Sequence, residues 1–244
     1  MANAARLERG KNWRGGGAGA YSAFMRTLTG SIALLLLSAC GFTSPGGGTG
    51  TLFVTARLTS DGSTAGSRAR ITVRAGSSTG DIVNNAEVAI RGGALARTIV
   101  PFDGGNGNNT QYRLDGFTWV EGFRLEVIRG NDKLDGSIDA PGPTLITNPI
   151  SDSTFKKTDG QPLIVTWKDT RNAPAHATQV RFDKANLDQA IPDGVLELRV
   201  DPANLTVDKE TVRVDRANEI ALAGGSAGSV LSASTTHEIE FRVE

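Results

Sequence analysis

The stretch FRLEVI, residues 123–128, alternates apolar and charged side chains until its last residue. A period of two places Phe123, Leu125 and Val127 on one face of an extended strand and the charged side chains on the other. Strands that bury one face and wet the other are typical of two antiparallel sheets packed face to face. The stretch therefore predicts an all-β protein built from sandwiches.

The same alternation recurs on both sides of this stretch. It predicts further strands in the first half at 52–58, 69–74, 86–91, 96–100 and 111–114, and in the second half at 163–167, 179–182, 195–200, 211–214 and 237–243. The 30 glycines favour many short strands joined by turns. No stretch of ten residues carries a helical stripe, and only DKANLDQA at 183–190 is compatible with one short helical turn.

The alternation is interrupted at APGP, residues 140–143. Proline and glycine together end regular structure, so this segment predicts a domain boundary. We expect two consecutive β-sandwich domains, residues 51–141 and 142–244, each of the usual size for such a module.

A different pattern precedes the first strand. Cys40 is the only cysteine, so an internal disulfide is excluded. It follows Arg26, the apolar run SIALLLL at 31–37 and the small residues Ser38 and Ala39, which is the order of a secretory signal peptide. The run is too short to remain in a bilayer as a spanning helix.

The four residues Leu37-Ser38-Ala39-Cys40 resemble the lipobox of bacterial lipoproteins. The resemblance implies diacylglycerol on the Cys40 thiol, cleavage just before that residue and usually a further acyl chain on the new amino terminus. One acyl chain anchors a protein only marginally, whereas two or three hold it firmly.

On this basis residues 1–39 are a lipoprotein signal peptide and residues 40–50 are the lipidated cysteine with a glycine-rich tether. The 24 residues before Met25 exceed a usual positive region, so translation starts either at Met1, with an extended leader, or at Met25, which we favour. Gly41 replaces the aspartate that resembles an inner-membrane retention signal in enterobacteria, which points towards the outer membrane of the cell envelope.

The charge balance restricts the partners. The chain has 26 basic and 26 acidic side chains, of which five basic and one acidic precede Cys40, so the remainder is mildly acidic. An acidic protein of this kind lacks the electrostatic signature of nucleic-acid binding. Net charge would not hold it on an anionic membrane either, so the bilayer is expected as a partner only through acylated Cys40.

The second half resembles immunoglobulin-like and fibronectin type III-like sandwiches. The resemblance rests on Pro149, on LIVTW at 163–167 in the place of the second strand with its core tryptophan, and on the Asp193-Gly194 turn. It departs from the antibody pattern in having no disulfide cysteines, and no tyrosine corner at Val195 and Leu196.

The first half is similar to carboxypeptidase regulatory-like or transthyretin-like modules, and an ordinary immunoglobulin-like module is the alternative. The similarity rests on Ala86-x-Val88-x-Ile90-x-Gly92, Tyr112-x-Leu114-x-Gly116-Phe117 and Leu125-x-Val127. All these families use the sandwich as a scaffold, so the fold does not fix the function.

We expect no enzymatic activity and no cofactor. The two histidines, His176 and His237, are expected in a loop and at the start of the last strand, and no Gly-x-Ser-x-Gly elbow is present. A zinc site of histidine and cysteine ligands is not expected.

Calcium, which prefers oxygen ligands, is an alternative because two segments carry several carboxylate and amide side chains. The first candidate comprises Asp103, Asn106 and Asn108, with Asn109 beside them, and the second is NDKLDG at 131–136. Neither has the order of an EF-hand loop, and ordinary turn chemistry explains both.

Trp119 is the candidate binding residue, because tryptophan is enriched at the centres of interfaces, although packing at the domain junction explains it as well. With an anchor, a tether and two modules, we expect a non-catalytic lipoprotein that binds a protein or another cell-envelope component. The alternatives are a structural or accessory subunit of an envelope assembly and, third, a hydrolase or carbohydrate-active enzyme.

Overall fold

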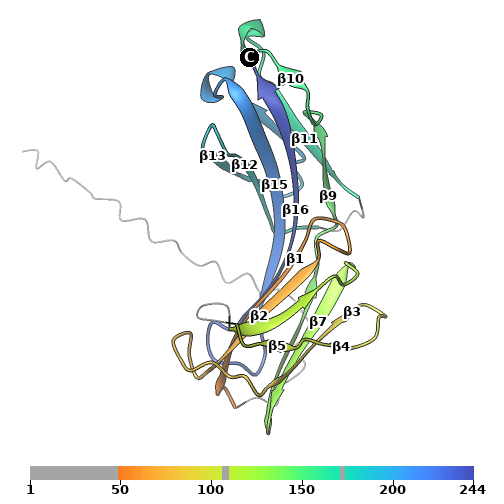
Figure 1. The fold of residues 1–244 in the computed structure, drawn as a ribbon, viewed down its shortest axis with the longest axis vertical. Helices are drawn as coiled ribbons and strands as arrows, with labels where there is room; N and C mark the ends of the chain where they lie inside the picture. The colour runs from red at the N-terminus through yellow and green to blue at the C-terminus, as the bar shows by residue number, and fades with distance from the viewer. Residues whose placement is uncertain (1–48, 106–109, 171–173) are drawn as a thin grey trace, which may run out of the picture. The chain divides into compact units, whose positions relative to one another are not determined.

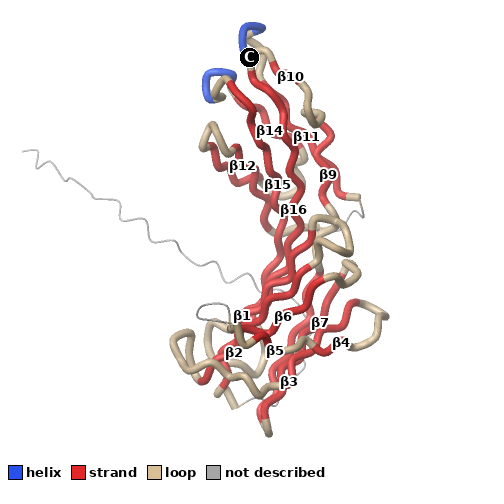
Figure 2. Tube along the Cα trace, in the orientation of Figure 1, coloured by secondary structure: helices blue, strands red, loops and turns tan. Residues whose placement is uncertain are grey.

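The computed structural model describes residues 49–105, 110–170 and 174–244. The predicted all-β fold is confirmed, because the described residues form sixteen strands and only two short 3-10 helices, Lys157–Asp159 and Pro202–Asn204 (Figure 2). Within these described ranges no helix has the length and apolarity needed to cross a membrane.

The strands form one large sheet and two small ones. The large sheet has nine strands, eight of them in the order β13-β12-β15-β16-β1-β2-β6-β5, with β10 paired to β16. The strands of this sheet are β13 (Leu187–Ile191), β12 (Ala177–Phe182), β15 (Asp208–Ala221), β16 (Val230–Val243), β1 (Leu52–Ser60), β2 (Arg68–Ala75), β6 (Gln111–Asp115), β5 (Phe102–Asp103) and β10 (Thr154–Phe155).

A four-stranded sheet packs against one part of the large sheet. Its strands, in order, are β4 (Thr98–Ile99), β3 (Glu87–Gly92), β7 (Gly122–Arg129) and β8 (Asp132–Asp139). Apolar side chains of β1, β2 and β6, among them Val54 and Ile71, meet Leu125 and Val127 of β7 in a first buried cluster. This is the sandwich that the alternation at 123–128 predicted.

A three-stranded sheet packs against the other part. Its strands, in order, are β14 (Glu197–Val200), β11 (Leu163–Asp169) and β9 (Thr144–Asn148). Val165 and Trp167 of β11 meet Val212 of β15 and Phe241 of β16 in a second buried cluster. Trp167 is thus a core residue, 3% exposed.

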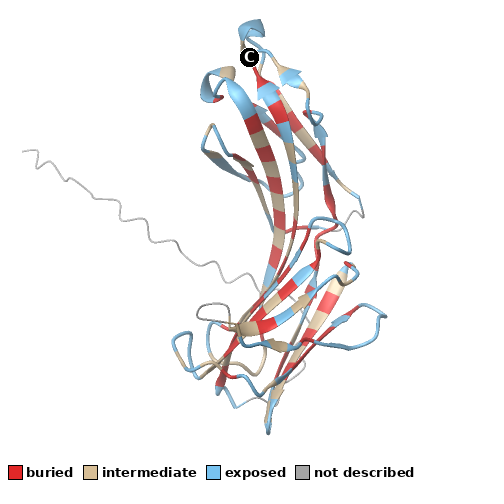
Figure 3. Ribbon diagram, in the orientation of Figure 1, coloured by how far each residue is buried: buried red, intermediate tan, exposed pale blue. Residues whose placement is uncertain are grey.

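The hairpin of β15 and β16 belongs to both clusters. Its strands have 14 residues each and pair along their whole length, from Asp208↔Val243 to Ala221↔Val230 (Figure 1). At about 3.4 Å per residue each strand is roughly 45 Å long. Val212 lies in the second cluster and Leu231 in the first, and buried and partly exposed residues alternate along β15 between them (Figure 3).

The long hairpin is relevant to the two expected domains because its residues pack in both clusters. The described residues belong to one compact unit, and Leu222, Leu231 and Ala233 pack in the first cluster although they follow residue 142 in the chain. In addition, β1 pairs in parallel with β16, from Thr55↔Val230 to Ser60↔Thr235. Residues 140–143 connect the two small sheets. The domain limits 51–141 and 142–244 stay predictions.

Residues 183–190, whose sequence is compatible with one short helical turn, form no helix. Residues 183–186 form a tight turn between β12 and β13, with Asn186 at a positive φ of 49°. The buried carboxylate of Glu210 accepts hydrogen bonds from the backbone N–H groups of Lys184 at 2.8 Å and Ala185 at 2.9 Å. These bonds fix a hairpin in place of a helical turn.

Other strand limits also differ from the expected ones. Only Thr98–Ile99 of the segment 96–100 pairs as a strand, and both residues are exposed. Val195 and Leu196 lie outside β14 and are 40% and 46% exposed. β8 and β9 were not expected, since neither alternates clearly in sequence, and both are strands because they pair with β7 and β11.

Candidate functional site

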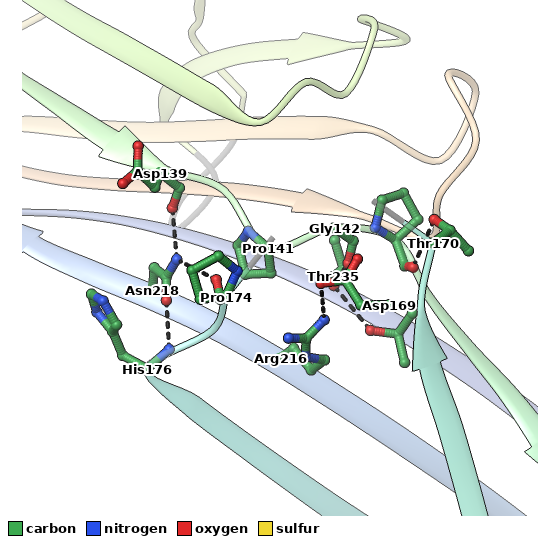
Figure 4. Close-up of polar contacts among 12 residues, drawn as sticks. Asp139, Pro141, Gly142, Asp169, Thr170, Pro174, His176, Arg216, Asn218 and Thr235 are labelled. Carbon is green, nitrogen blue, oxygen red and sulfur yellow. Dashed lines mark hydrogen bonds and ion pairs between the residues drawn. The ribbon is translucent and has the colours of Figure 1, made fainter. Parts of the chain in front are cut away.

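A polar network lies where the chain passes from the first small sheet to the second. Asn218 of β15 is 2% exposed and uses both ends of its amide. Its Nδ2 donates to the carbonyls of Asp139 at 2.8 Å and Pro174 at 3.1 Å, and its Oδ1 accepts from the backbone N–H of His176 at 2.6 Å (Figure 4). One side chain thus satisfies three backbone groups from two segments, the end of β8 and the loop before β12.

A buried ion pair continues this network. Arg216 Nη1 of β15 lies 2.7 Å from Asp169 Oδ2 at the end of β11, and their side chains are 8% and 9% exposed (Figure 4). The nearby Gly142 has room only for hydrogen, because a Cβ there would lie 1.9 Å from Asp169 Oδ1. The segment at 140–143 is therefore packed tightly against the end of β11.

Hydroxyl groups secure the same segment. Thr235 of β16 is fully buried and donates to the carbonyl of Gly142 at 3.1 Å. The hydroxyl of Thr170 donates to the carbonyl of Pro143 at 3.0 Å. Backbone carbonyls of the connecting segment thus find partners on β16 and at the end of β11, which holds the connection in one conformation.

A groove of about 620 Å³ lies beside this junction. It is lined by the loop between β1 and β2 and by the outer faces of β15 and β16. The residues that line it are Thr59, Ser60, Asp61, Ser63, Gly66, Arg68, Arg213, Thr236, His237 and Glu238. Two carboxylates and two arginines make its charge balanced, and we take this junction groove as the candidate functional site.

Three charged groups of the junction groove, Asp61, Arg213 and Glu238, are engaged with one another or with the loop. Asp61 Oδ1 accepts from the backbone N–H of Ser63 at 2.8 Å and from its hydroxyl at 2.7 Å. These hydrogen bonds lower the pKa of Asp61. Arg213 donates to Glu238 Oε2 at 2.8 Å, and this hydrogen bond raises the pKa of Arg213.

His237 holds β9 against β16 at the edge of the groove. Its Nδ1 accepts a hydrogen bond from the backbone N–H of Ile146 at 3.3 Å, so this nitrogen carries no proton. Burial lowers the pKa of His237, and the neighbouring Glu238 acts in the opposite direction. The imidazole is placed to support a strand, and its Nδ1 is occupied by that role.

The groove residues were not singled out from the sequence, apart from His237. Arg213 and Glu238 are 25 positions apart and become neighbours only because β15 and β16 pair with Arg213 opposite Glu238. The loop carrying Asp61 and Ser63 is brought to them by the parallel pairing of β1 with β16. A long hairpin predicted at full length would have been the one usable signal.

The residues proposed from the sequence lie elsewhere. Cys40, Asn106 and Asn108 fall outside the described residues, as does Asn109. Asp103 is exposed on β5, opposite Gln111 of β6. In the described part of the chain, no group of three or more histidine, cysteine, aspartate or glutamate side chains is arranged to hold a metal.

The second calcium candidate, residues 131–136, forms the start of β8 and its turn. Asp132 accepts hydrogen bonds from the hydroxyls of Thr49 and Thr51 just before β1, and they lower its pKa. Asp135 pairs with Arg124 at 2.9 Å. Both carboxylates are therefore used in holding strands together.

Trp119 is a core residue in this structure. It is 2% exposed, and its indole N–H donates to the carbonyl of Pro141 at 2.9 Å. Its ring packs against Phe123 with centroids 5.1 Å apart. The side chain is therefore not exposed as an anchor for a partner. It joins the first cluster to the connecting segment. His176 is exposed in the loop before β12, as the sequence suggested.

Comparisons with known proteins identify no family for this chain. No family model matches the chain, and no curated protein matches it. Among solved structures it is similar to the Yersinia pseudotuberculosis adhesin InvE, with 17% identity and a TM-score of 0.22 over 79% of this chain. The match spans 61% of the adhesin's length.

Proposed function

We propose that this chain is a lipid-anchored protein of the bacterial cell envelope that binds a protein or another envelope component without catalysing a reaction. The observation that carries the binding role is the junction groove. It is contributed by strands of both clusters and is held by the shared β15–β16 hairpin. Most of its ionisable side chains make hydrogen bonds that shape the surface, which suits recognition better than proton transfer.

The anchor rests on the lipobox-like residues Leu37-Ser38-Ala39-Cys40 and on the tether that follows them. The tether of residues 41–50 leads directly to β1. From its glycine-rich composition we expect the tether to reach about 15–20 Å. That length lets the sandwiches clear the lipid head groups while the chain stays attached to the membrane.

The anchor is tested by comparing the wild-type chain with Cys40→Ala after expression in a lipoprotein-processing bacterium. We expect the wild type in the membrane fraction, with an amino-terminal peptide that begins at an acylated Cys40 by mass spectrometry. Cys40→Ala should leave the membrane fraction or remain unprocessed. Wild-type peptides free of acyl groups, together with membrane association of the variant, would exclude the anchor.

The binding role is tested by cross-linking in cells. A photo-reactive residue at Ser63, which is exposed in the junction groove, should give adducts with a ligand. The same residue at exposed Asp193, in the turn before β14, is the matched control and should not. Equal labelling at both positions, or none at Ser63, would argue against the groove as the binding site.

A structural role within an envelope assembly is the second candidate. The hairpin of β15 and β16 favours it, because a pair of strands common to both clusters resists bending between them. The cross-linking experiment separates the two roles. A single neighbour in fixed stoichiometry supports assembly, whereas adducts that depend on an added or external ligand support binding.

A further inference from the structure

The outer face of β1, β2 and β6 carries a row of arginines. Arg57 of β1 pairs directly opposite Arg70 of β2, and Arg70 pairs directly opposite Arg113 of β6. Neighbouring strands are about 4.8 Å apart, so three guanidinium groups start from adjacent backbone positions on one face. Arg74 of β2 lies on the same face, two pleats from Arg70, opposite Phe53.

A shallow hollow of about 540 Å³ covers this face. We call it the basic hollow, and it is lined by Phe53, Thr55, Arg57, Arg70, Thr72, Arg74, Ser78 and Gln111. Three arginines and no carboxylate are among these residues. Hydroxyl and amide groups stand between the charges, and one aromatic ring lies at the end.

The carboxylates near the basic hollow flank it and only partly neutralise it. Asp115 pairs with Arg70 at 2.7 Å and with Arg113 at 2.8 Å. Asp103 lies beyond Gln111 on β5, and Glu219 of β15 is separated from Arg57 by Ser232. Within the described residues the side chain of Arg57 makes no hydrogen bond or ion pair, and Arg74 donates only to the carbonyl of Gly80, at 2.9 Å.

Like charges directly opposite on neighbouring strands are destabilising, whereas opposite charges contribute roughly 0.2–1 kcal/mol. Elsewhere on the large sheet Arg181 is opposite Arg213, and Lys209 is opposite Arg242. There Arg181, Arg213 and Lys209 each form an ion pair with a carboxylate. The arginine row differs in that Arg57 has no carboxylate partner among the described residues, although the chain is acidic overall from Cys40 onward. A positively charged face of this kind suits an anionic ligand.

We propose that the basic hollow binds an extended acidic polysaccharide, with Arg57 and Arg74 pairing to its anionic groups. The basic hollow shares no lining residue with the junction groove, so the inference adds a second ligand site to the proposed binding role. Arginine pairs with carboxylate, sulfate and phosphate groups in two-point geometry. Thr55, Thr72 and Gln111 offer hydrogen bonds to sugar hydroxyls, and Phe53 offers a ring to a sugar face.

Other anionic partners fit this face less well. Proteins that bind single-stranded nucleic acid stack successive bases on several aromatic rings, and the basic hollow has one partly buried ring. Docking onto a lipid surface draws on apolar side chains that enter the head-group layer, and Phe53 alone is available here. These two ligands become the alternative outcomes of the test.

The test measures binding of the full chain carrying Cys40→Ala, so that acyl chains do not contribute, to polygalacturonate by titration calorimetry. We expect binding that weakens as salt rises and no binding to neutral dextran. Arg57→Gln with Arg74→Gln should weaken polygalacturonate binding on the order of tenfold. Arg91→Gln with Arg242→Gln removes two exposed arginines elsewhere and should change it by less than about twofold.

Arg57→Lys with Arg74→Lys keeps the charge and should retain part of the affinity, and circular dichroism checks that each variant is folded. Absence of polygalacturonate binding at low salt, or equal binding by the glutamine variant, would overturn the proposal. Binding of single-stranded DNA or phosphatidylglycerol vesicles that is as tight and as dependent on Arg57 and Arg74 would also overturn it. Because the assay omits the acyl anchor, its outcome is independent of the test of Cys40.

Discussion

Arg216 of β15 and Asp169 at the end of β11 form an ion pair at 2.7 Å with both side chains less than a tenth exposed. The pair joins the large sheet to the three-stranded sheet beside the segment that connects the two small sheets. A buried charge left without its partner is costly, whereas replacing both partners by apolar groups often costs little. This contrast gives the first prediction.

Asp169→Ala should lower the free energy of unfolding by about 3–5 kcal/mol, because it leaves the Arg216 guanidinium buried without this carboxylate. The double variant Asp169→Leu with Arg216→Met should recover a substantial part of that loss. Urea unfolding followed by tryptophan fluorescence measures both. A double variant no more stable than Asp169→Ala would show that an unpaired buried charge is not the cause of the loss.

Asn218→Ala should destabilise the protein by roughly 3 kcal/mol, because the carbonyls of Asp139 and Pro174 and the N–H of His176 lose a buried partner. Hydrogen exchange at the amide of His176 should rise most. Glu219→Ala, at the next and exposed position of β15, is the matched control and should change the stability by less than about 0.5 kcal/mol. Protection of His176 unchanged in Asn218→Ala would contradict the assigned network.

Tyr112→Phe should cost about 1–2 kcal/mol of stability while leaving the fold intact. The hydroxyl of Tyr112 donates to the carbonyl of Val83 at 3.1 Å and accepts from the N–H of Ala86 at 2.9 Å. Phenylalanine keeps the ring, which packs against Phe102 at 5.1 Å between centroids, and leaves both backbone groups unpaired. Thermal unfolding measures the loss, and an unchanged midpoint would show that water satisfies these groups.

The stability of the protein should fall as the pH drops below about 6.5, through His237. Burial holds the pKa of His237 below its ordinary value of 6.5 in the folded state. The unfolded chain therefore takes up the proton first, and the stability present above pH 6.5 is lost as the pH falls towards the folded-state pKa. A proton on Nδ1 would also displace the hydrogen bond from Ile146.

His237→Gln should flatten the dependence of unfolding free energy on pH between about 7.5 and 5.5, where few carboxylates titrate. His176→Gln removes the other histidine of the chain, which is exposed, and should leave the slope in place. The measurement is urea unfolding at a series of pH values. A slope that is the same in wild type and His237→Gln would assign the dependence to other groups.

The strands that could be predicted from the sequence are those whose alternation reports a local two-sided environment. Residues 123–128 and 69–74 lie within β7 and β2 with the expected faces buried, because each strand has one face on a core and one in water. β8 and β9 were not predicted from the sequence. Asp135 and Thr144 are buried polar residues whose hydrogen-bond partners lie on other strands, so they break the apolar pattern. The turn at 183–186 depends on Glu210, which lies more than twenty positions away.

The candidate sites also depend on tertiary structure more than on local sequence. The residues of the junction groove and of the arginine row have ordinary surface character in the sequence, and strand register alone places Arg57 beside Arg70 and Arg213 beside Glu238. Trp119 shows the converse, since a residue type frequent at interfaces is buried here by Phe123 and Pro141.

By itself the sequence determined an all-β chain, because a period of two is a property of each strand and needs no knowledge of its neighbours. It also supplied the lipobox-like segment on which the proposed anchor depends. Only the tertiary structure decided that β1 joins β16, so that one sheet serves two buried clusters. Pairing between strands nearly two hundred residues apart is set by the summed fit of many side chains, which no local pattern contains.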